Sequence, residues 1–146
     1  VKVGYARSER YRQSTLKVIN ELGLHEDVSF TGYLSDEEVA LYYSNARCLL
    51  FPSLYEGFGF PALEAMACGC PVITSDNSSL PEVVGDAGVM VNPYDTDSLA
   101  QAMREVLTNS KLRDDMVRKG LEQSKKFSWE RAAEQTQEVY EKVARE

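Results

Sequence analysis

Residues 52–71 read PSLYEGFGFPALEAMACGCP and are the clearest indication of the fold. The apolar run Cys48–Phe51 precedes it and has the composition of a buried strand. Pro61 suits the first turn of a helix, and Gly69 is a typical helix end. The apolar run Pro71–Ser75 then predicts a second strand. Because both strands are apolar throughout and a helix joins them, we expect them to be parallel.

The same alternation continues on both sides of this stretch. Further strands are predicted at Val1–Gly4, Val28–Thr31 and Val89–Val91, and further helices at Arg10–Leu22, 35–44, Leu80–Val84, Asp95–Leu107, Leu112–Lys126 and Ser128–Arg145. Apolar strands that alternate with helices predict an α/β fold, a Rossmann-like parallel sheet with helices on both faces. Ligands of such sheets bind beyond the carboxyl ends of the strands, here the loops after Phe30, Phe51 and Thr74.

The composition limits the classes of function. The chain has 146 residues, of which 43% are hydrophobic, and this suits a globular domain. A formal net charge of −7 disfavours nucleic acid as a partner, because phosphate is repelled. No apolar run reaches the ~20 residues that span a bilayer, and no signal-peptide layout is present. Cys48, Cys68 and Cys70 fit neither a disulfide nor a zinc pattern, so we expect free thiols and a cytoplasmic protein.

The loop of residues 52–60 and the helix after it carry the groups with the clearest chemistry. Glu56 lies in the loop, beside glycines that let the backbone approach a ligand closely. The amides of Gly57–Phe60 come just before a helix N-terminus, where phosphate or sugar oxygens are favoured. Glu64 lies about one turn inside the helix and could accept hydrogen bonds from the vicinal hydroxyls of a ribose. The spacing of the two acids is weak evidence alone, and its context of strand, glycines and helix gives it weight.

The segment Tyr55–Ser75, YEGFGFPALEAMACGCPVITS, resembles the signature of group 1 glycosyltransferases, which are retaining enzymes of family 4 with two Rossmann-like domains. Three further segments agree: Val28–Ser35 (VSFTGYLS), Leu80–Gly88 (LPEVVGDAG) followed by Val91–Pro93 (VNP), and Phe127–Trp129 (FSW). The resemblance covers nearly the whole chain. It implies that residues 1–146 are the C-terminal, nucleotide-sugar-binding domain of the GT-B architecture.

The resemblance also implies roles for single residues. Glu56 would contact the donor sugar near the reacting carbon, and Glu64 would hold the ribose. The backbone of Gly57, Phe58, Gly59 and Phe60 would hold the sugar hydroxyls and the pyrophosphate. Tyr33 and Leu34 would lie by the base, although simple packing explains these two side chains equally well.

The chain departs from the family pattern in one respect. Such domains open with a strand and a loop whose Arg and Lys grip the donor phosphates, and neither is recognisable here. Arg7, Arg10 and Lys17 do not stand in that pattern and are expected to be surface charges. The N-terminal acceptor-binding domain is also absent from these 146 residues. We therefore expect the isolated chain to be inactive.

Asp95-Thr-Asp97 has the form of a metal-binding Asp-x-Asp motif. It stands directly before a predicted helix, where Asp97 or Ser98 would be the N-cap and the acids would suit the helix dipole. We expect capping rather than metal binding, and the resemblance implies that no metal cofactor is needed.

The sequence thus predicts a glycosyltransferase domain that binds an NDP-sugar donor, whose sugar passes to an acceptor hydroxyl with retention of configuration. Two other interpretations remain: a nucleotide-sugar epimerase or phosphorylase of the same fold, and a non-catalytic nucleotide-sugar-binding or assembly module. The full enzyme could work at the inner membrane surface. Apolar positions of the last helix that a partner domain would cover predict self-association of the isolated domain (Ala132, Ala133, Val139, Tyr140 and Val143).

Overall fold

The computed structural model of the chain describes residues 1–4 and 8–145. They fall into two compact units, residues 1–41 and 42–146, and the boundary lies within helix α2 (Asp36–Asn45). Arg7 lies outside the described residues. Within the described residues, no helix combines the length and the apolar character needed to cross a membrane.

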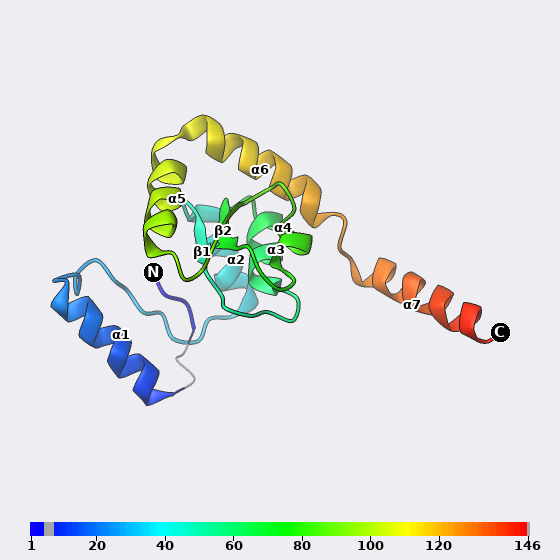
Figure 1. Ribbon diagram of the computed structural model, residues 1–146, viewed down its shortest axis with the longest axis horizontal. Helices are drawn as coiled ribbons and strands as arrows, with labels where there is room; N and C mark the ends of the chain where they lie inside the picture. Colours follow the sequence, from blue (N-terminus) through cyan, green and yellow to red (C-terminus); the bar gives the residue numbers. More distant parts are fainter. Residues whose placement is uncertain (5–7, 146) are drawn as a thin grey trace. The chain divides into compact units, whose positions relative to one another are not determined.

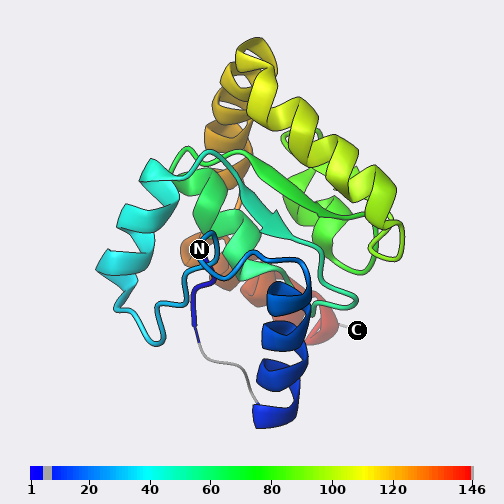
Figure 2. The same ribbon diagram turned by 90° about the vertical axis from the view of Figure 1, so that its left-hand side faces the viewer.

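The first unit contains one complete helix, α1 (Glu9–Glu21), which Figure 2 shows in dark blue followed by coil. The strands predicted at Val1–Gly4 and Val28–Thr31 were wrong, since the described residues form only isolated bridges there. Lys2 pairs with Phe30 in the parallel sense, and Gly4 pairs with Gly32 in the antiparallel sense. The physical reason is the left-handed backbone of both glycines, with φ of 85° at Gly4 and 70° at Gly32. An extended ladder cannot continue through such residues.

The second unit is built on a parallel sheet in the order β1-β2-β3. The strands are β1 (Leu49–Phe51), β2 (Val72–Ser75) and β3 (Val89–Val91). The helices are α3 (Phe60–Ala67), α4 (Leu80–Val84), α5 (Thr96–Thr108), α6 (Ser110–Ser124) and α7 (Trp129–Val143). Phe51 pairs with Thr74 and Ser75 pairs with Val91, so the strands end at one edge of the sheet.

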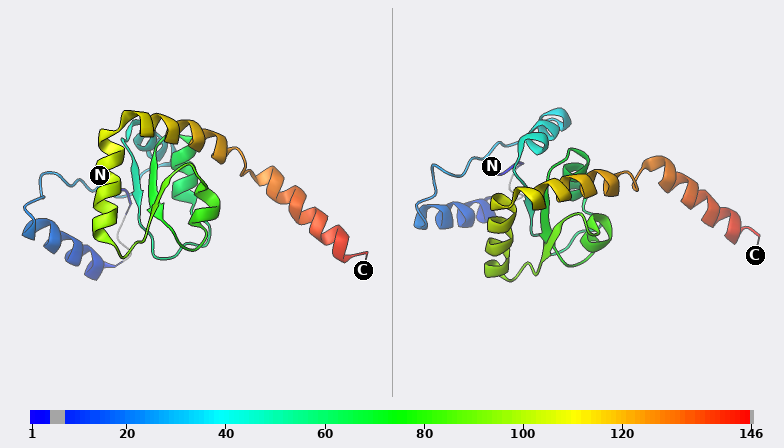
Figure 3. Two further views of the ribbon diagram at one scale, coloured as in Figure 1. Left: turned by 45° about the horizontal axis from the view of Figure 1, so that its top comes forward. Right: turned by 90° about the horizontal axis from the view of Figure 1, so that it is seen from above.

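Helices cover both faces of this sheet (Figure 3). Val72 packs in a fully buried cluster with side chains of α3 and α4, while its neighbour Ile73 packs with Val106 of α5 and Met116 of α6. Successive residues of a strand point to opposite faces, so β2 supplies both halves of the core. The predicted fold class, an α/β parallel sheet with helices on both faces, is confirmed.

The last helix is the exception to this packing. Residues 128–145 are all exposed, and α7 extends away from the sheet and its helices in Figure 1. The predicted partial exposure of its apolar positions is confirmed, since Val139 is 59% exposed and Tyr140 is 71% exposed.

Candidate functional site

The ends of β1 and β2 and the loops that follow them are bound to each other at the carboxyl edge of the sheet. Thr74 Oγ1 donates to the carbonyl of Phe51 at 2.9 Å, and Ser75 Oγ donates to the carbonyl of Ser53 at 2.6 Å. Asn77 Nδ2 donates to the carbonyl of Leu54 at 3.1 Å. The position predicted for a ligand site, after Phe51 and Thr74, is therefore a fixed part of the second unit.

Glu56 is held on three sides. Its carboxylate accepts a hydrogen bond from Ser53 Oγ at 2.7 Å, and its N–H donates to Ser78 Oγ at 3.1 Å. Its carbonyl accepts from Ser79 Oγ at 3.0 Å, and the same hydroxyl reaches the carbonyl of Phe58 at 2.7 Å. The side chain is half-buried, so the loop presents it in one fixed place.

The structure requires a glycine at only one of the two glycine positions of the loop. Gly59 is buried and has φ of 106°, and a Cβ there would lie 2.8 Å from Cδ2 of the fully buried Leu80. Gly57 is exposed, has no positive φ, and a Cβ there would meet nothing within 4 Å. Packing and backbone strain therefore explain Gly59, whereas neither requires a glycine at position 57, which suits a place where a ligand approaches the backbone.

Four successive N–H groups lead into α3 without a partner. Among the described residues, none accepts a hydrogen bond from the amides of Gly57, Phe58, Gly59 or Phe60. The first amides of a helix have no acceptor inside it and carry its positive partial charge. The arrangement is suited to the oxygens of an anion or of a polyhydroxylated ligand.

Glu64 lies on α3, one turn beyond these amides, and is exposed. Burial raises the pKa of Tyr43 to about 12, and the negative charge of Glu64 contributes to this rise. Among the described residues, none forms a hydrogen bond or an ion pair with the carboxylate of Glu64, so this carboxylate can accept hydrogen bonds from hydroxyl groups.

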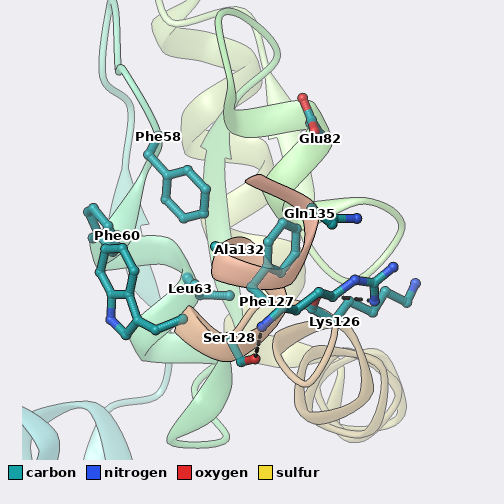
Figure 4. A pocket seen from close by; sticks show the side chains of 11 residues that line it. Phe58, Phe60, Leu63, Glu82, Lys126, Phe127, Ser128, Ala132 and Gln135 are labelled. Atoms are coloured by element: carbon teal, nitrogen blue, oxygen red, sulfur yellow. Dashed lines mark hydrogen bonds between the residues drawn. The ribbon is translucent and has the colours of Figure 1, made fainter. Parts of the chain in front are cut away.

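An aromatic row borders the same loop. The rings of Phe58 and Phe60 lie 4.7 Å apart, Phe127 meets Phe58 edge-on at 5.8 Å, and Trp129 lies 6.2 Å from Phe60. Together with Leu63 and residues at the start of α7 they line a groove of about 630 Å³ (Figure 4). The sequence singled out Phe127 and Trp129 only as part of a resemblance, and their contact with the loop was not predicted.

Comparison with known proteins now decides the family. Residues 3–123 match the family model described as "Glycosyl transferases group 1". The chain belongs to this family. It is 44% identical over 113 residues to the O-antigen chain mannosyltransferase B of Escherichia coli, and this alignment covers 77% of this chain and 30% of that protein. It is 42% identical over 136 residues to the MMP alpha-(1->4)-mannosyltransferase of Mycolicibacterium hassiacum, and this alignment covers 88% of this chain and 32% of that protein.

Among solved structures, the sucrose-phosphate synthase of Thermosynechococcus elongatus matches with a TM-score of 0.85 and 31% identity. That match covers 97% of this chain and 38% of the synthase. The chain therefore spans about a third of the length of these relatives. The family and the fold predicted from residues 55–75 are confirmed.

The other residues predicted for this group 1 glycosyltransferase lie in the first unit. Tyr33 is 78% exposed, and Leu34 is half-buried just before α2, where Ser35 and Glu38 form the predicted capping box. Their place beside a base remains a prediction. Lys17 is exposed and pairs with Glu21 at 3.7 Å.

The Asp-x-Asp pair of this glycosyltransferase is built into a helix start, as predicted, but the residue that caps is Asp95. Its carboxylate accepts from the N–H of Ser98 at 3.0 Å and from Ser98 Oγ at 2.7 Å, and α5 begins at the next residue, Thr96. These bonds, the backbone one first, lower the pKa of Asp95. The expectation that Asp97 or Ser98 would be the N-cap was wrong, because the helix begins two residues earlier.

Proposed function

We propose that this chain is the donor-binding part of a glycosyltransferase that passes a hexosyl group from a nucleotide diphosphate sugar to an acceptor hydroxyl, with retention of configuration. The observation that carries this proposal is the row of unpartnered amides at Gly57–Phe60, which lies between the fixed Glu56 and the exposed Glu64. The amides would bind the oxygens of the diphosphate and the sugar. Glu56 would lie near the reacting carbon, and Glu64 would bind the ribose.

Each group would have its own task. The amides at the start of α3 would stabilise the charge that develops on the departing diphosphate. Glu56 would stand nearest the anomeric carbon, where a carboxylate gains attraction as positive charge develops in the transition state. Glu64 would accept hydrogen bonds from the ribose hydroxyls, which do not change during the reaction. Tyr33 and Leu34 would border the base.

The donor we propose to test first is a mannosyl one, because two relatives above 40% identity are named mannosyltransferases. The acceptor would be bound by an N-terminal domain outside these 146 residues, and we expect the isolated chain to bind donor without turnover. Free thiols at Cys48, Cys68 and Cys70 suit the reducing cytoplasm. We propose that no metal cofactor takes part and that Asp95 and Asp97 serve α5.

Calorimetric titration of the chain with GDP-mannose, UDP-glucose and ADP-glucose tests the proposal. We expect saturable binding of one of these donors without added metal, and a clear loss of that binding in Glu64→Ala. In a titration with Mn²⁺ we expect no binding heat that depends on Asp97. The parent chain and Asp97→Ala should therefore give the same result. Binding of none of the three donors by the folded chain would overturn the proposed function.

A further inference from the structure

We propose that Ser78 and Ser79, in the loop after β2, are positioning residues that set where Glu56 stands relative to the donor sugar. The inference rests on the proposed function and adds two residues to it. Neither serine was among the candidates from the sequence. The only signal there is the run of small polar residues that follows β2 at the edge of the sheet.

The two serines form hydrogen bonds with the two backbone polar groups of Glu56. Ser78 Oγ accepts the N–H of Glu56 at 3.1 Å. Ser79 Oγ shares its single hydrogen between the carbonyl of Glu56 at 3.0 Å and the carbonyl of Phe58 at 2.7 Å. Both peptide groups that flank the Glu56 Cα are thereby fixed, and Ser53 fixes its carboxylate at 2.7 Å. A side chain whose backbone and carboxylate are both fixed is preorganised for a ligand.

Ser78 adopts a strained backbone conformation to make its contact. Its φ is 51°, and among the described residues it is the only one other than glycine with a positive φ. Such a conformation has a free-energy cost that glycine would avoid, and it persists only where surrounding contacts enforce it. The observed outlier coincides with the hydroxyl that accepts the N–H of Glu56, which points to a functional reason for a serine.

Ser79 stands on a rigid base. It is the residue before α4, whose side chains Leu80, Val83 and Val84 are all buried. The other end of α4 is held from α6, where the buried amide of Gln123 donates to the carbonyl of Val83 at 3.1 Å. The hydroxyl of Ser79 is therefore anchored to the core of the second unit.

The serines bond to Glu56 and Phe58, and in the described part of the chain neither forms a hydrogen bond with Glu64. Loss of the Ser78 hydroxyl should weaken recognition of the sugar and leave recognition of the nucleotide intact. Loss of the Ser79 hydroxyl should weaken both, because the carbonyl of Phe58 shares a peptide group with the N–H of Gly59. A purely structural role would instead weaken both in proportion to the loss of stability.

The test compares dissociation constants of a nucleotide sugar and of its nucleotide, for example GDP-mannose and GDP, for the unaltered chain and for variants. In Ser78→Ala we expect the ratio of the two constants to shift against the sugar by about three- to tenfold, while nucleotide affinity changes by less than about twofold. Ser79→Ala also releases the carbonyl of Phe58, so it should shift the ratio in the same direction and weaken the nucleotide as well. Ser79→Thr keeps the hydroxyl and should restore the ratio. Ser124→Ala, which removes a hydroxyl bonded at 3.1 Å to a carbonyl of α6, is the matched control and should leave both constants unchanged.

Ser78→Gly separates positioning from stability. It relieves the strain, so its melting temperature should equal or exceed that of the parent, yet it should lose sugar discrimination as Ser78→Ala does. Unchanged ratios in folded Ser78→Gly and Ser79→Ala would overturn the positioning role while leaving the donor site intact. Parent protein that binds neither ligand would overturn the proposed function and this inference with it.

Discussion

The loop between β1 and α3 and the helix α7 hold their backbones in opposite ways. The loop has no repeating hydrogen bonds, yet side chains of the next loop bind its carbonyls and the N–H of Glu56. Helix α7 satisfies its backbone internally, and none of its residues, all of which are described, is buried. The irregular segment is the one fixed by tertiary contacts.

Regular secondary structure and structural constraint are therefore separate properties in this protein. Most helical stability in proteins comes from packing of an apolar face, and α7 has little such packing within this chain. Substitutions in the loop should therefore have larger effects than the removal of several turns of helix.

The sharpest test of this contrast is Gly59→Ala, for which we expect the largest loss of stability, about 2–4 kcal/mol. An alanine at position 59 would have to adopt φ of 106°, which is unfavourable for a residue with a Cβ. Its Cβ would also lie too close to Leu80, which is fully buried and cannot easily move. Denaturant unfolding measures the loss. Gly57→Ala is the control, since a Cβ there meets nothing, and it should keep the stability of the parent while weakening donor binding.

Next in size are the two acids at the ends of the amide row. Glu64→Ala should weaken donor affinity by about ten- to a hundredfold and spare kcat, because it removes binding that is equal in the ground and transition states. Glu56→Ala should mainly lower kcat. Steady-state kinetics require an enzyme that also contains the acceptor domain. If Glu56→Ala left kcat intact in a folded enzyme, the roles of the two acids would have to be abandoned.

Removal of the N-cap residue should have a smaller effect on stability, and the effect should differ between α5, which is packed, and α7, which is not. Asp95 and Ser128 cap α5 and α7 in the same way, but α5 buries Ala102 and Val106 whereas α7 buries nothing. Asp95→Ala should therefore lower the melting temperature of the unit, and Ser128→Ala should not.

The contribution of Asp95 should also depend on pH. Because its pKa is lower in the folded state, the stabilisation is present above the ordinary aspartate pKa of about 3.9 and is lost as the pH falls through the folded-state value. Melting temperatures of parent and Asp95→Ala should accordingly converge in acid. An equal effect of Asp95→Ala and Ser128→Ala at neutral pH would contradict the contrast between α5 and α7.

The smallest effect is expected from deletion of residues 134–146, which should change the melting temperature by less than about 3 °C. The deletion leaves Phe127 and Trp129 beside the loop and removes only exposed residues from those described. Light scattering should show self-association of the full chain that the shortened one lacks. A strictly monomeric full chain, with α7 protected from hydrogen exchange, would show that its apolar face is covered in another way.

The sequence was sufficient wherever a local signal determined the structure. The strands β1 and β2, the first turn of α3 around Pro61 and the capping box of Ser35 follow from residue types within a few positions. The bridges around Phe30 were not predictable in this way, because they depend on the left-handed backbone of Gly32. The fixing of Glu56 by serines beyond β2 was also hidden, since it depends on strand register rather than on any pattern near Glu56.

That separation along the chain has a consequence for how the protein is made. The hydroxyls that hold Glu56 from Ser78 and Ser79 belong to residues 22 and 23 positions later in the sequence. A ribosome adding about 5–20 residues per second would extend the chain for roughly 1–5 s between the two segments. During that interval the nascent loop has its local partner Ser53 but lacks the side chains beyond β2 that hold its backbone. The ligand site can therefore take form only after β2 and the serines behind it have left the exit tunnel.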